Sequence, residues 1–312
     1  MLKIKKGQTI EFKATYQEGL FDTKARECTY AIACMDVFKN KELLGKYNID
    51  CIITDPPYNL LDHKIETGID TDKMFSLFYE HLPKNSFCSF FGQHPGLNSF
   101  LNSAYKAGFK YKAEIIWDKM GISNPFGDIL RSHENNIVLT KGSQRVYDNK
   151  ISFEKWMDEN YFLKTEKLKK ELSYWKAKAQ GREVTGMSNT KAKSDHQTYR
   201  HLSRITQTLG NDTKRIQSVW HVHRDQMLKK GQKSHVTQKP LEFMSRLVRM
   251  LSKEGQLVCD PFGGSGSTLL SCLKIRRDCI MYEIHEDIAN FAIYRILAYF
   301  EDFDIKFSYK IL

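Results

Sequence analysis

Short apolar runs rich in β-branched residues alternate in this chain with segments whose apolar residues recur every three or four positions. The first pattern is typical of buried strands and the second of helices that pack on a sheet. Their alternation predicts an α/β protein with a doubly wound, mostly parallel sheet. Residues 1 to about 30 otherwise look irregular. The predicted strands are 9–14, 49–54, 86–91, 113–117, 136–140, 256–259 and 278–283, with a strand that runs into a helix at 30–38, and the predicted helices are 72–82, 95–107, 241–251, 268–274 and 288–300.

The pattern changes near residue 141. One segment beyond it places its apolar residues on one face of a predicted lysine-rich helix, and 181–203 has the Thr, Ser, Gly, Lys and Arg content of a flexible loop. The sheet-forming pattern returns after Pro240. We therefore predict a discontinuous domain made of residues 1–140 and 235–312, with a separate region, 141–234, inserted into it.

Basic side chains concentrate in the same inserted region. The chain has 48 Lys and Arg against 37 Asp and Glu, a net charge of +11. Residues 1–140 carry 17 of each sign and residues 235–312 carry 10 of each, whereas residues 141–234 carry 21 basic and 10 acidic side chains. A localised excess is typical of a surface that binds a polyphosphate such as nucleic acid. A lysine-rich helix is also often simply solvated, so charge alone leaves both interpretations open.

The remaining composition excludes several classes of protein. With 41% hydrophobic and 27% charged residues, the 312-residue chain resembles an ordinary globular protein. No apolar run approaches the roughly 18 residues that cross a bilayer, and the amino terminus lacks the apolar core of a signal peptide. The seven cysteines contain no C-x-x-C pair, and the histidines form no metal-ligand set. We therefore predict a cytoplasmic protein with no metal site and no membrane partner.

The first stretch with candidate chemistry is Asp55-Pro56-Pro57-Tyr58, directly after the predicted strand 49–54. Two prolines end that strand because neither can donate to a sheet ladder. The resulting loop holds a carboxylate beside an aromatic ring at the carboxyl end of a strand, where open α/β sheets bind their ligands. An acid that accepts an N–H and a ring that stacks suit a flat substrate with an amino group. A strand followed by an ordinary turn is the simpler alternative.

The second stretch, residues 258–268, is a predicted strand, a glycine turn and the start of a helix. Gly263, Gly264 and Gly266 allow the backbone to turn tightly and to approach a ligand closely. About twenty residues further on, Glu283 ends the next predicted strand, where an acid commonly accepts hydrogen bonds from a ribose diol. An exposed acid at a strand end is the simpler alternative.

These stretches resemble motifs of the amino-group DNA methyltransferases that use S-adenosylmethionine. The first matches their D-P-P-Y motif, the second their D-P-F-x-G-S-G loop, and residues 235–240, with the sequence HVTQKP, match their T-Q-K-P element. The order of the motifs resembles the β class, a circularly permuted, Rossmann-like methyltransferase fold. The resemblance implies S-adenosylmethionine as cofactor, double-stranded DNA as substrate and the cytoplasm of a bacterial or phage-infected cell as location. It also admits a homodimer and a cognate restriction endonuclease as partners.

The resemblance implies roles for individual residues. Asp55 and the carbonyl of Pro56 would accept hydrogen bonds from the target amino group, and Tyr58 would stack on a base flipped out of the duplex. Lys239 would hold the methionine carboxylate of the cofactor. The implied catalytic residues are Asp55, Pro56, Pro57 and Tyr58, and the implied cofactor-binding residues are His235, Thr237, Lys239, Asp260, Phe262, Gly263, Gly264, Ser265, Gly266 and Glu283.

The inserted region 141–234 occupies the place of the target-recognition region in β-class enzymes. Its basic side chains are candidates for contacts with DNA phosphates, which hold the register of the complex. These candidates are Lys164, Lys167, Lys170, Lys191, Lys193, Arg200 and Arg204.

Two features qualify the resemblance. Family members usually carry Gly-Asp, whose acid reaches the cofactor adenine, where this chain has Ile32-Ala33; Asp36 is a candidate substitute, or an ordinary acid at a helix amino terminus. Aspartate rather than serine at position 55 resembles the enzymes that methylate the 6-amino group of adenine. The alternatives are methylation of the 4-amino group of cytosine, methylation of RNA, and a nucleic-acid-binding module with a decayed methyltransferase fold.

Overall fold

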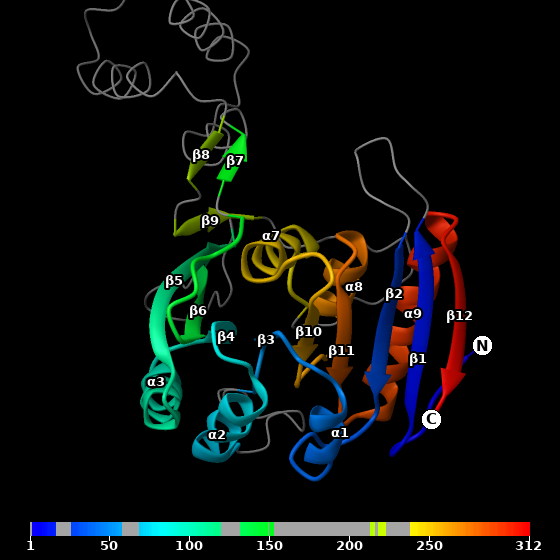
Figure 1. Ribbon diagram of the computed structural model, residues 1–312, viewed down its shortest axis with the longest axis horizontal. Coiled ribbons are helices and arrows are strands. Elements are labelled where there is room, and N and C mark those ends of the chain that lie inside the picture. Colours follow the sequence, from blue (N-terminus) through cyan, green and yellow to red (C-terminus); the bar gives the residue numbers. More distant parts are fainter. Residues whose placement is uncertain are drawn as a thin grey trace, which may run out of the picture. The chain divides into compact units, whose positions relative to one another are not determined.

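The computed structural model describes residues 2–16, 26–57, 69–119, 132–148, 150–152, 213–215, 218–222 and 238–312. The chain divides into two compact units, the first made of Met1–Asp148 with Ser218–Leu312 and the second of Asn149–Gln217. The first unit contains the large sheet and its helices (Figure 1). In the second unit, the described residues form an antiparallel pair of short strands, β7 (Lys150–Ser152) and β8 (Thr213–Arg215).

Ten strands of the described part of the first unit form one mixed sheet, in the order β12-β1-β2-β11-β10-β3-β4-β6-β5-β9. The five strands from β2 to β4 are parallel, whereas β12, β1 and β2 are joined by antiparallel pairs, as are β4, β6 and β5. The strands are β1 (Thr9–Tyr16), β2 (Arg26–Ala33), β3 (Cys51–Thr54), β4 (Ser86–Gly92), β5 (Lys110–Asp118), β6 (His133–Lys141), β9 (Val219–His221), β10 (Leu257–Asp260), β11 (Asp278–Tyr282) and β12 (Lys306–Ile311).

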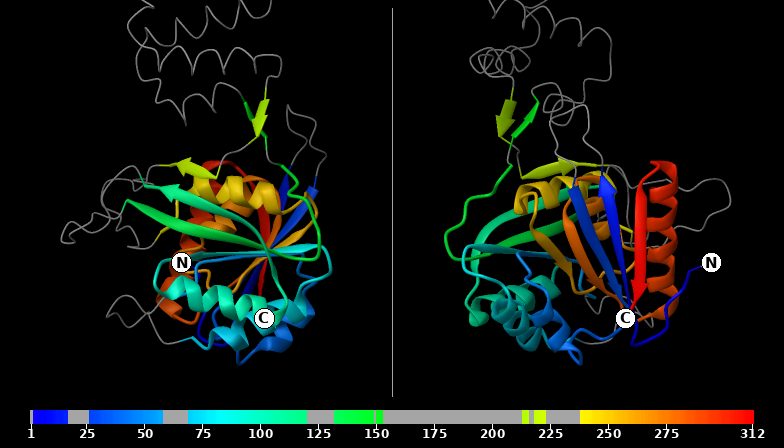
Figure 2. Two further views of the ribbon diagram at one scale, coloured as in Figure 1. Left: turned by 90° about the vertical axis from the view of Figure 1, so that its left-hand side faces the viewer. Right: turned by 45° about the vertical axis from the view of Figure 1, so that its right-hand side comes forward.

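Helices cover both faces of the sheet. The ring of Phe90 packs on Phe75 of α2 and Phe100 of α3, at centroid distances of 5.2 and 5.8 Å. The next residue, Phe91, contacts Phe243 of α7 at 5.5 Å. Because successive strand residues point to opposite faces, α2 and α3 lie on one side of the sheet and α7 on the other (Figure 2). The helices are α1 (Lys41–Lys46), α2 (Thr71–His81), α3 (Gly96–Ala107), α7 (Leu241–Leu251), α8 (Ser267–Lys274) and α9 (Glu286–Asp302).

The predicted α/β class with a mostly parallel sheet is confirmed, with two corrections to the amino-terminal part of the chain and a more detailed strand arrangement. The predicted strand 9–14 is present as part of β1, but residues 26–29, expected to be irregular, belong to β2, which pairs with β1 along its whole length. The segment expected to run from strand into helix at 30–38 ends as a strand at Ala33, and the next helix begins at Lys41. The sheet is parallel only at its centre and at the β5–β9 contact, since β12 and the β5–β6 pair add antiparallel strands. Strand direction depends on backbone partners far away in the chain, which local periodicity does not contain.

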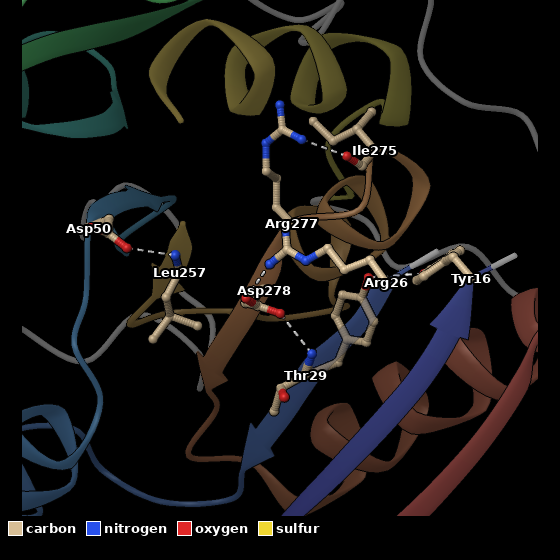
Figure 3. A network of polar contacts seen from close by, with 9 residues as sticks. Tyr16, Arg26, Thr29, Asp50, Leu257, Ile275, Arg277 and Asp278 are labelled. Atoms are coloured by element: carbon tan, nitrogen blue, oxygen red, sulfur yellow. Dashed lines mark hydrogen bonds and ion pairs between the residues drawn. The ribbon is translucent and has the colours of Figure 1, made fainter. Parts of the chain in front are cut away.

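Polar contacts fix the register at the amino ends of the central strands (Figure 3). Asp278, the first residue of β11, accepts hydrogen bonds from the Arg26 guanidinium at 2.7 Å and the Thr29 amide at 2.8 Å. Asp50, which precedes β3, accepts one from the Leu257 amide at 2.9 Å. These contacts join β2 to β11 and β3 to β10. With the parallel strands in this register, the segments that follow β2, β3, β10 and β11 all emerge at the opposite edge.

The described residues contain neither a helix that could span a membrane nor a disulfide bond. None of the helices in these ranges combines the length and apolarity that crossing a bilayer requires. All seven cysteines are buried and free.

Replacement of Phe75 by alanine tests the aromatic core beneath α2. Its ring is fully buried and contacts the rings of Phe78, Phe90, Phe100 and Phe109. We expect Phe75→Ala to lower the free energy of unfolding by about 3–5 kcal/mol, measured by chemical denaturation. The control Phe303→Ala removes a ring that is 63% exposed and should cost less than about 1 kcal/mol. Equal losses in the two variants would contradict the assignment of the core.

Candidate active site

A cavity of about 340 Å³ lies at the carboxyl edge of the parallel strands. This is the edge at which open α/β sheets bind ligands, and the volume suits a small cofactor. Lys239 and Met244, before and within α7, also contribute to its lining. The main walls are the segments that follow β2, β3, β10 and β11, namely residues 35–38, 55–57, 260–265 and 282–285.

Asp55 is the first residue beyond β3. All four residues of that strand are buried, and the two prolines that follow Asp55 end the ladder as predicted. The Asp55 side chain is 24% exposed, and its Oδ2 accepts a hydrogen bond from Nζ of Lys239. The structure therefore places a partly buried carboxylate at the cavity, held from one side by an ammonium group.

The glycine loop between β10 and α8 lies against the end of β11. The Gly263 amide donates to the carbonyl of Tyr282 at 2.8 Å, and a Cβ at Gly263 would lie 2.7 Å from the Cβ of Met281. Gly266 precedes α8 with a φ of 80°, a conformation that side chains disfavour. Any other residue at position 263 would push the loop away from β11, so this glycine allows the close approach.

Asp260 connects three segments of the site. Its carboxylate accepts hydrogen bonds from Oγ1 of Thr54 at 2.8 Å, from the amide of Phe262 at 3.2 Å and from Oγ1 of Thr268. These donors belong to β3, the glycine loop and α8. Burial raises the pKa of Asp260 from its ordinary value near 3.8 to about 6, although the three hydrogen bonds favour the charged form.

Glu283 follows β11 and faces the same cavity. Its Oε2 accepts the Gly264 amide at 3.0 Å and its Oε1 accepts the His285 amide at 2.8 Å. The side chain is buried, and this burial raises the pKa of Glu283 above its usual value. Each oxygen retains a second lone pair, so the carboxylate can still accept hydrogen bonds from a ligand.

An aromatic pair and an acid line the part of the cavity after β2. The rings of Phe38 and Phe262 lie 6.1 Å apart. Asp36 also lines the cavity, and its Oδ1 accepts the Phe38 amide at 2.9 Å. Ala33 is buried at the end of β2 and binds the Glu283 amide through its carbonyl. Of the two roles considered for Asp36, an acid at a helix amino terminus is not observed, because Asp36 lies at the cavity and starts a turn.

Lys239 is the second buried charge beside Asp55. Its ammonium contacts Asp55 and also Oε2 of Glu134, at 3.1 Å, and it lies 4.7 Å from the centre of the Phe91 ring. Burial opposes its charge, but the two carboxylates outweigh burial and raise the pKa of Lys239 above its ordinary value. Its ammonium is therefore protonated at neutral pH.

Glu134 and Lys119 extend this ion pair into the interior. Oε1 of Glu134 contacts Nζ of Lys119, which lies 5.3 Å from the centre of the Trp117 ring. Burial disfavours the charge on Glu134, but the ammonium groups of Lys239 and Lys119 outweigh burial and hold its pKa well below its usual value. Neither residue was predicted from the sequence, because a charged residue at a strand end is usually solvated and nothing in the local sequence indicates that these two are paired in the interior.

The structure brings most of the predicted site residues together. Gly266 precedes α8, between two residues that line the cavity, Ser265 and Ser267. Tyr58, His235, Thr237 and the seven basic residues predicted to contact DNA lie outside the described residues. In the described ranges no cluster of three or more His, Cys, Asp or Glu could hold a metal ion. The predicted residues that line the cavity are Asp55, Pro56, Pro57, Lys239, Asp260, Phe262, Gly263, Gly264, Ser265 and Glu283.

Comparison with known proteins adds independent information. A family model for N6 and N4 methyltransferases, described as "DNA methylase", matches residues 49–294. The chain is 24% identical to type II methyltransferase M.HpaI of Haemophilus parainfluenzae over 277 residues, which cover 88% of this chain and 76% of that protein. It is 47% identical to type II methyltransferase M.HindIII of Haemophilus influenzae over 62 residues, only 20% of either chain.

Solved structures share the fold at low sequence identity. The M1.HpyAVI–SAM complex superposes with a TM-score of 0.50 at 17% identity, over 85% of this chain and 98% of that one. PvuII DNA methyltransferase (cytosine-N4-specific) also gives 0.50, at 15% identity, over 85% of this chain and 86% of that one. At these identities the likeness shows the fold alone.

Replacement of Asp260 by asparagine tests the buried carboxyl group. Because the pKa of Asp260 is higher in the folded chain than in the unfolded chain, its proton stabilises the fold below about pH 4, and this stabilisation is lost as the pH rises through about 6. Asparagine does not titrate, so the stability of the Asp260→Asn variant does not fall for this reason as the pH rises. We expect the free energy of unfolding of the variant, relative to the native chain, to increase by about 3 kcal/mol from about pH 4 to about pH 7. Denaturation curves across this range measure it, and a pH-independent difference would contradict the raised pKa.

Proposed function

The chain belongs to the N6/N4 DNA methylase family, and from its site we propose that it transfers a methyl group from S-adenosylmethionine to the 6-amino group of adenine in a specific sequence of double-stranded DNA. The observation that carries this proposal is the shared cavity of Asp55 and the glycine loop. Asp55, the acid proposed to bind the substrate, and the glycine loop, proposed to bind the cofactor, come from distant parts of the chain. They meet at one edge of the sheet. Such a meeting is what a two-substrate transfer requires.

The residues around the cavity fit S-adenosylmethionine. Gly263 allows the loop to lie close to β11, Glu283 offers acceptor lone pairs for a ribose diol, and the Phe38 and Phe262 rings offer apolar surface for an adenine. The Lys239 ammonium has three donors, so it can bind the methionine carboxylate as well as its two protein partners. When bound, this cofactor supplies an electrophilic methyl group on a sulfonium.

Asp55 and Pro56 then prepare the attacking nitrogen. The Asp55 carboxylate accepts one hydrogen bond from the amino group of the base, and the Pro56 carbonyl, which lies beyond the last residue of β3, accepts the other. Two acceptors directed at one nitrogen localise its lone pair and orient it for in-line attack. As the N–C bond forms, the C–S bond breaks and a neutral thioether leaves, while the methylated nitrogen gives up one proton, for which the hydrogen-bonded Asp55 carboxylate is an acceptor. The main contribution of Asp55 and Pro56 is positioning and electrostatic stabilisation, because a sulfonium already carries a good leaving group. Tyr58 is proposed to stack on the base.

The target base has to leave the duplex to reach this cavity. Base flipping costs a few kcal/mol, and phosphate contacts offset that cost. The excess of basic side chains in residues 141–234 supports a target-recognition role for this region, with its lysines and arginines as the phosphate contacts. The motif order, with Asp55 before the glycine loop, supports the circularly permuted β-class arrangement of a Rossmann-like fold.

Adenine is preferred over cytosine because of the acid at position 55. Aspartate there resembles adenine-modifying enzymes, whereas enzymes that modify cytosine more often begin the motif with serine. Methylation of the 4-amino group of cytosine is the second candidate, since both groups are exocyclic amines that the same pair of acceptors can bind. RNA as substrate is a third. A decayed binding module is disfavoured by the buried ion pairs around Asp55 and by the intact glycine loop.

The cellular role follows from the named relatives. M.HpaI and M.HindIII are type II methyltransferases. We propose that this chain likewise modifies DNA in a restriction–modification system, in the cytoplasm, with a cognate restriction endonuclease as its functional partner. A homodimer stays a prediction from the sequence resemblance.

Sequencing of modified bases in DNA tests the proposed function. Genomic DNA from cells that express the native chain should contain 6-methyladenine at one recurring sequence, and DNA from cells that express the Asp55→Ala variant should not. Recurrent 4-methylcytosine would replace the proposed base with the second candidate. Unmodified DNA, together with methylated RNA, would contradict DNA as the substrate.

A further inference from the structure

Four charged side chains form a continuous line from the interior to the cavity. Lys119 contacts Glu134, Glu134 contacts Lys239, and Lys239 contacts Asp55. The signs alternate, so the line has no net charge. The side chains of Lys119, Glu134 and Lys239 are 5, 12 and 8% exposed, whereas Asp55, at the cavity, is 24% exposed. The line therefore begins inside the protein and ends on the proposed catalytic acid.

The surroundings of this line restrict how its ammonium groups can move. Trp117 and Glu134 are cross-strand partners on β5 and β6, and the Trp117 ring lies beside Lys119. Phe91, on the neighbouring strand β4, lies beside Lys239. A buried ammonium that loses one carboxylate partner cannot replace it with water at low cost, so the position of Lys239 depends on Glu134 as well as on Asp55.

We propose that Glu134 is a positioning residue for methyl transfer, which fixes the ammonium of Lys239 so that Lys239 holds the Asp55 carboxylate in its orientation at the cavity. This inference rests on the proposed function. Lys119 completes the arrangement, because it balances the second oxygen of Glu134 and keeps that carboxylate directed between the two ammonium groups. In this account Glu134 touches neither substrate nor cofactor. Its effect on the reaction passes through Lys239 to Asp55.

The test compares Glu134→Gln with a matched control on the neighbouring strand. Glutamine keeps the size of the side chain and removes its charge. The control is Glu114→Gln: Glu114 on β5 accepts a hydrogen bond from Asn135, at 2.8 Å, and lies outside the line of charges. We expect Glu134→Gln to slow single-turnover methyl transfer at saturating S-adenosylmethionine by about 100-fold, the order expected when a catalytic group is misplaced by about an ångström. Because Lys239 is also proposed to bind the methionine carboxylate, the dissociation constant for S-adenosylmethionine should rise in this variant, and the rates are therefore compared at saturating cofactor. The control should retain the native rate and affinity.

A double variant separates positioning from stability. Glu134→Gln removes a carboxylate that both buried ammonium groups contact, which also destabilises the fold. Adding Lys119→Met restores the charge balance, so thermal stability should recover while the rate stays low, because Lys239 still lacks its anchor. A rate that recovers together with stability would overturn the proposal, as would a native rate in Glu134→Gln at saturating cofactor. If the Glu134→Gln variant does not fold, the rate of the double variant alone tests the proposal: a low rate supports it and a native rate overturns it.

A structural measurement keeps this inference separate from the proposed function. Crystal structures of the native chain and of Glu134→Gln, both without cofactor, should show Nζ of Lys239 within hydrogen-bond distance of Asp55 in the first and displaced from it in the second. An unchanged pair would overturn the inference even if the native chain methylates DNA. A native chain that transfers no methyl group would defeat the proposed function, and the two crystal structures would still decide the role of Glu134.

Discussion

One buried carboxylate holds the candidate active site together. Asp260 accepts hydrogen bonds from Thr54 at the end of β3, from the amide of Phe262 in the glycine loop and from Thr268 in α8. These bonds connect the segment that ends in Asp55 to the glycine loop at the end of the short β3–β10 ladder. The site geometry is fixed at the cost of burying a carboxyl group, whose pKa rises accordingly.

The chemistry of the site follows from what this arrangement leaves at the cavity. Asp260 is committed to structure, whereas Asp55 lies one residue beyond Thr54 at the cavity and has an ammonium group as its neighbour. Two acids of the same type therefore have different environments: Asp260 is bound by three protein donors, whereas Asp55 is more exposed and contacts an ammonium group. The same edge of the sheet also receives Glu283 and the glycine loop, so the groups that would bind a cofactor lie on the same cavity as the acid.

Part of this site could be predicted from the sequence. The D-P-P-Y stretch and the glycine loop could be predicted because prolines and glycines act locally: prolines end a strand, and glycines permit a close turn. The strands that precede the two segments are also strongly apolar. The α/β class of the fold could be predicted from the alternation of strand-like and helix-like segments along the chain. The antiparallel edge strands could not be predicted, because β12 pairs with β1 across almost the whole chain.

Glu134 and Lys119 show a second limit of prediction from the sequence, which concerns buried charged side chains. A carboxylate or an ammonium at the end of a strand is normally solvated, and its burial becomes plausible only when the opposite charge is known to lie beside it. Here the partner of Glu134 is Lys239, about a hundred residues later in the chain. Only the folded sheet brings the two together.

The central proposal assigns catalysis to Asp55 and cofactor binding to the glycine loop and Glu283, which line the same cavity. The most direct test is the single-turnover rate of methyl transfer by Asp55→Ala at saturating S-adenosylmethionine, with cofactor binding measured on the same preparation. The account predicts a rate at least roughly 100-fold below the native rate with cofactor affinity largely retained. A native rate per bound cofactor, with affinity lost instead, would contradict it.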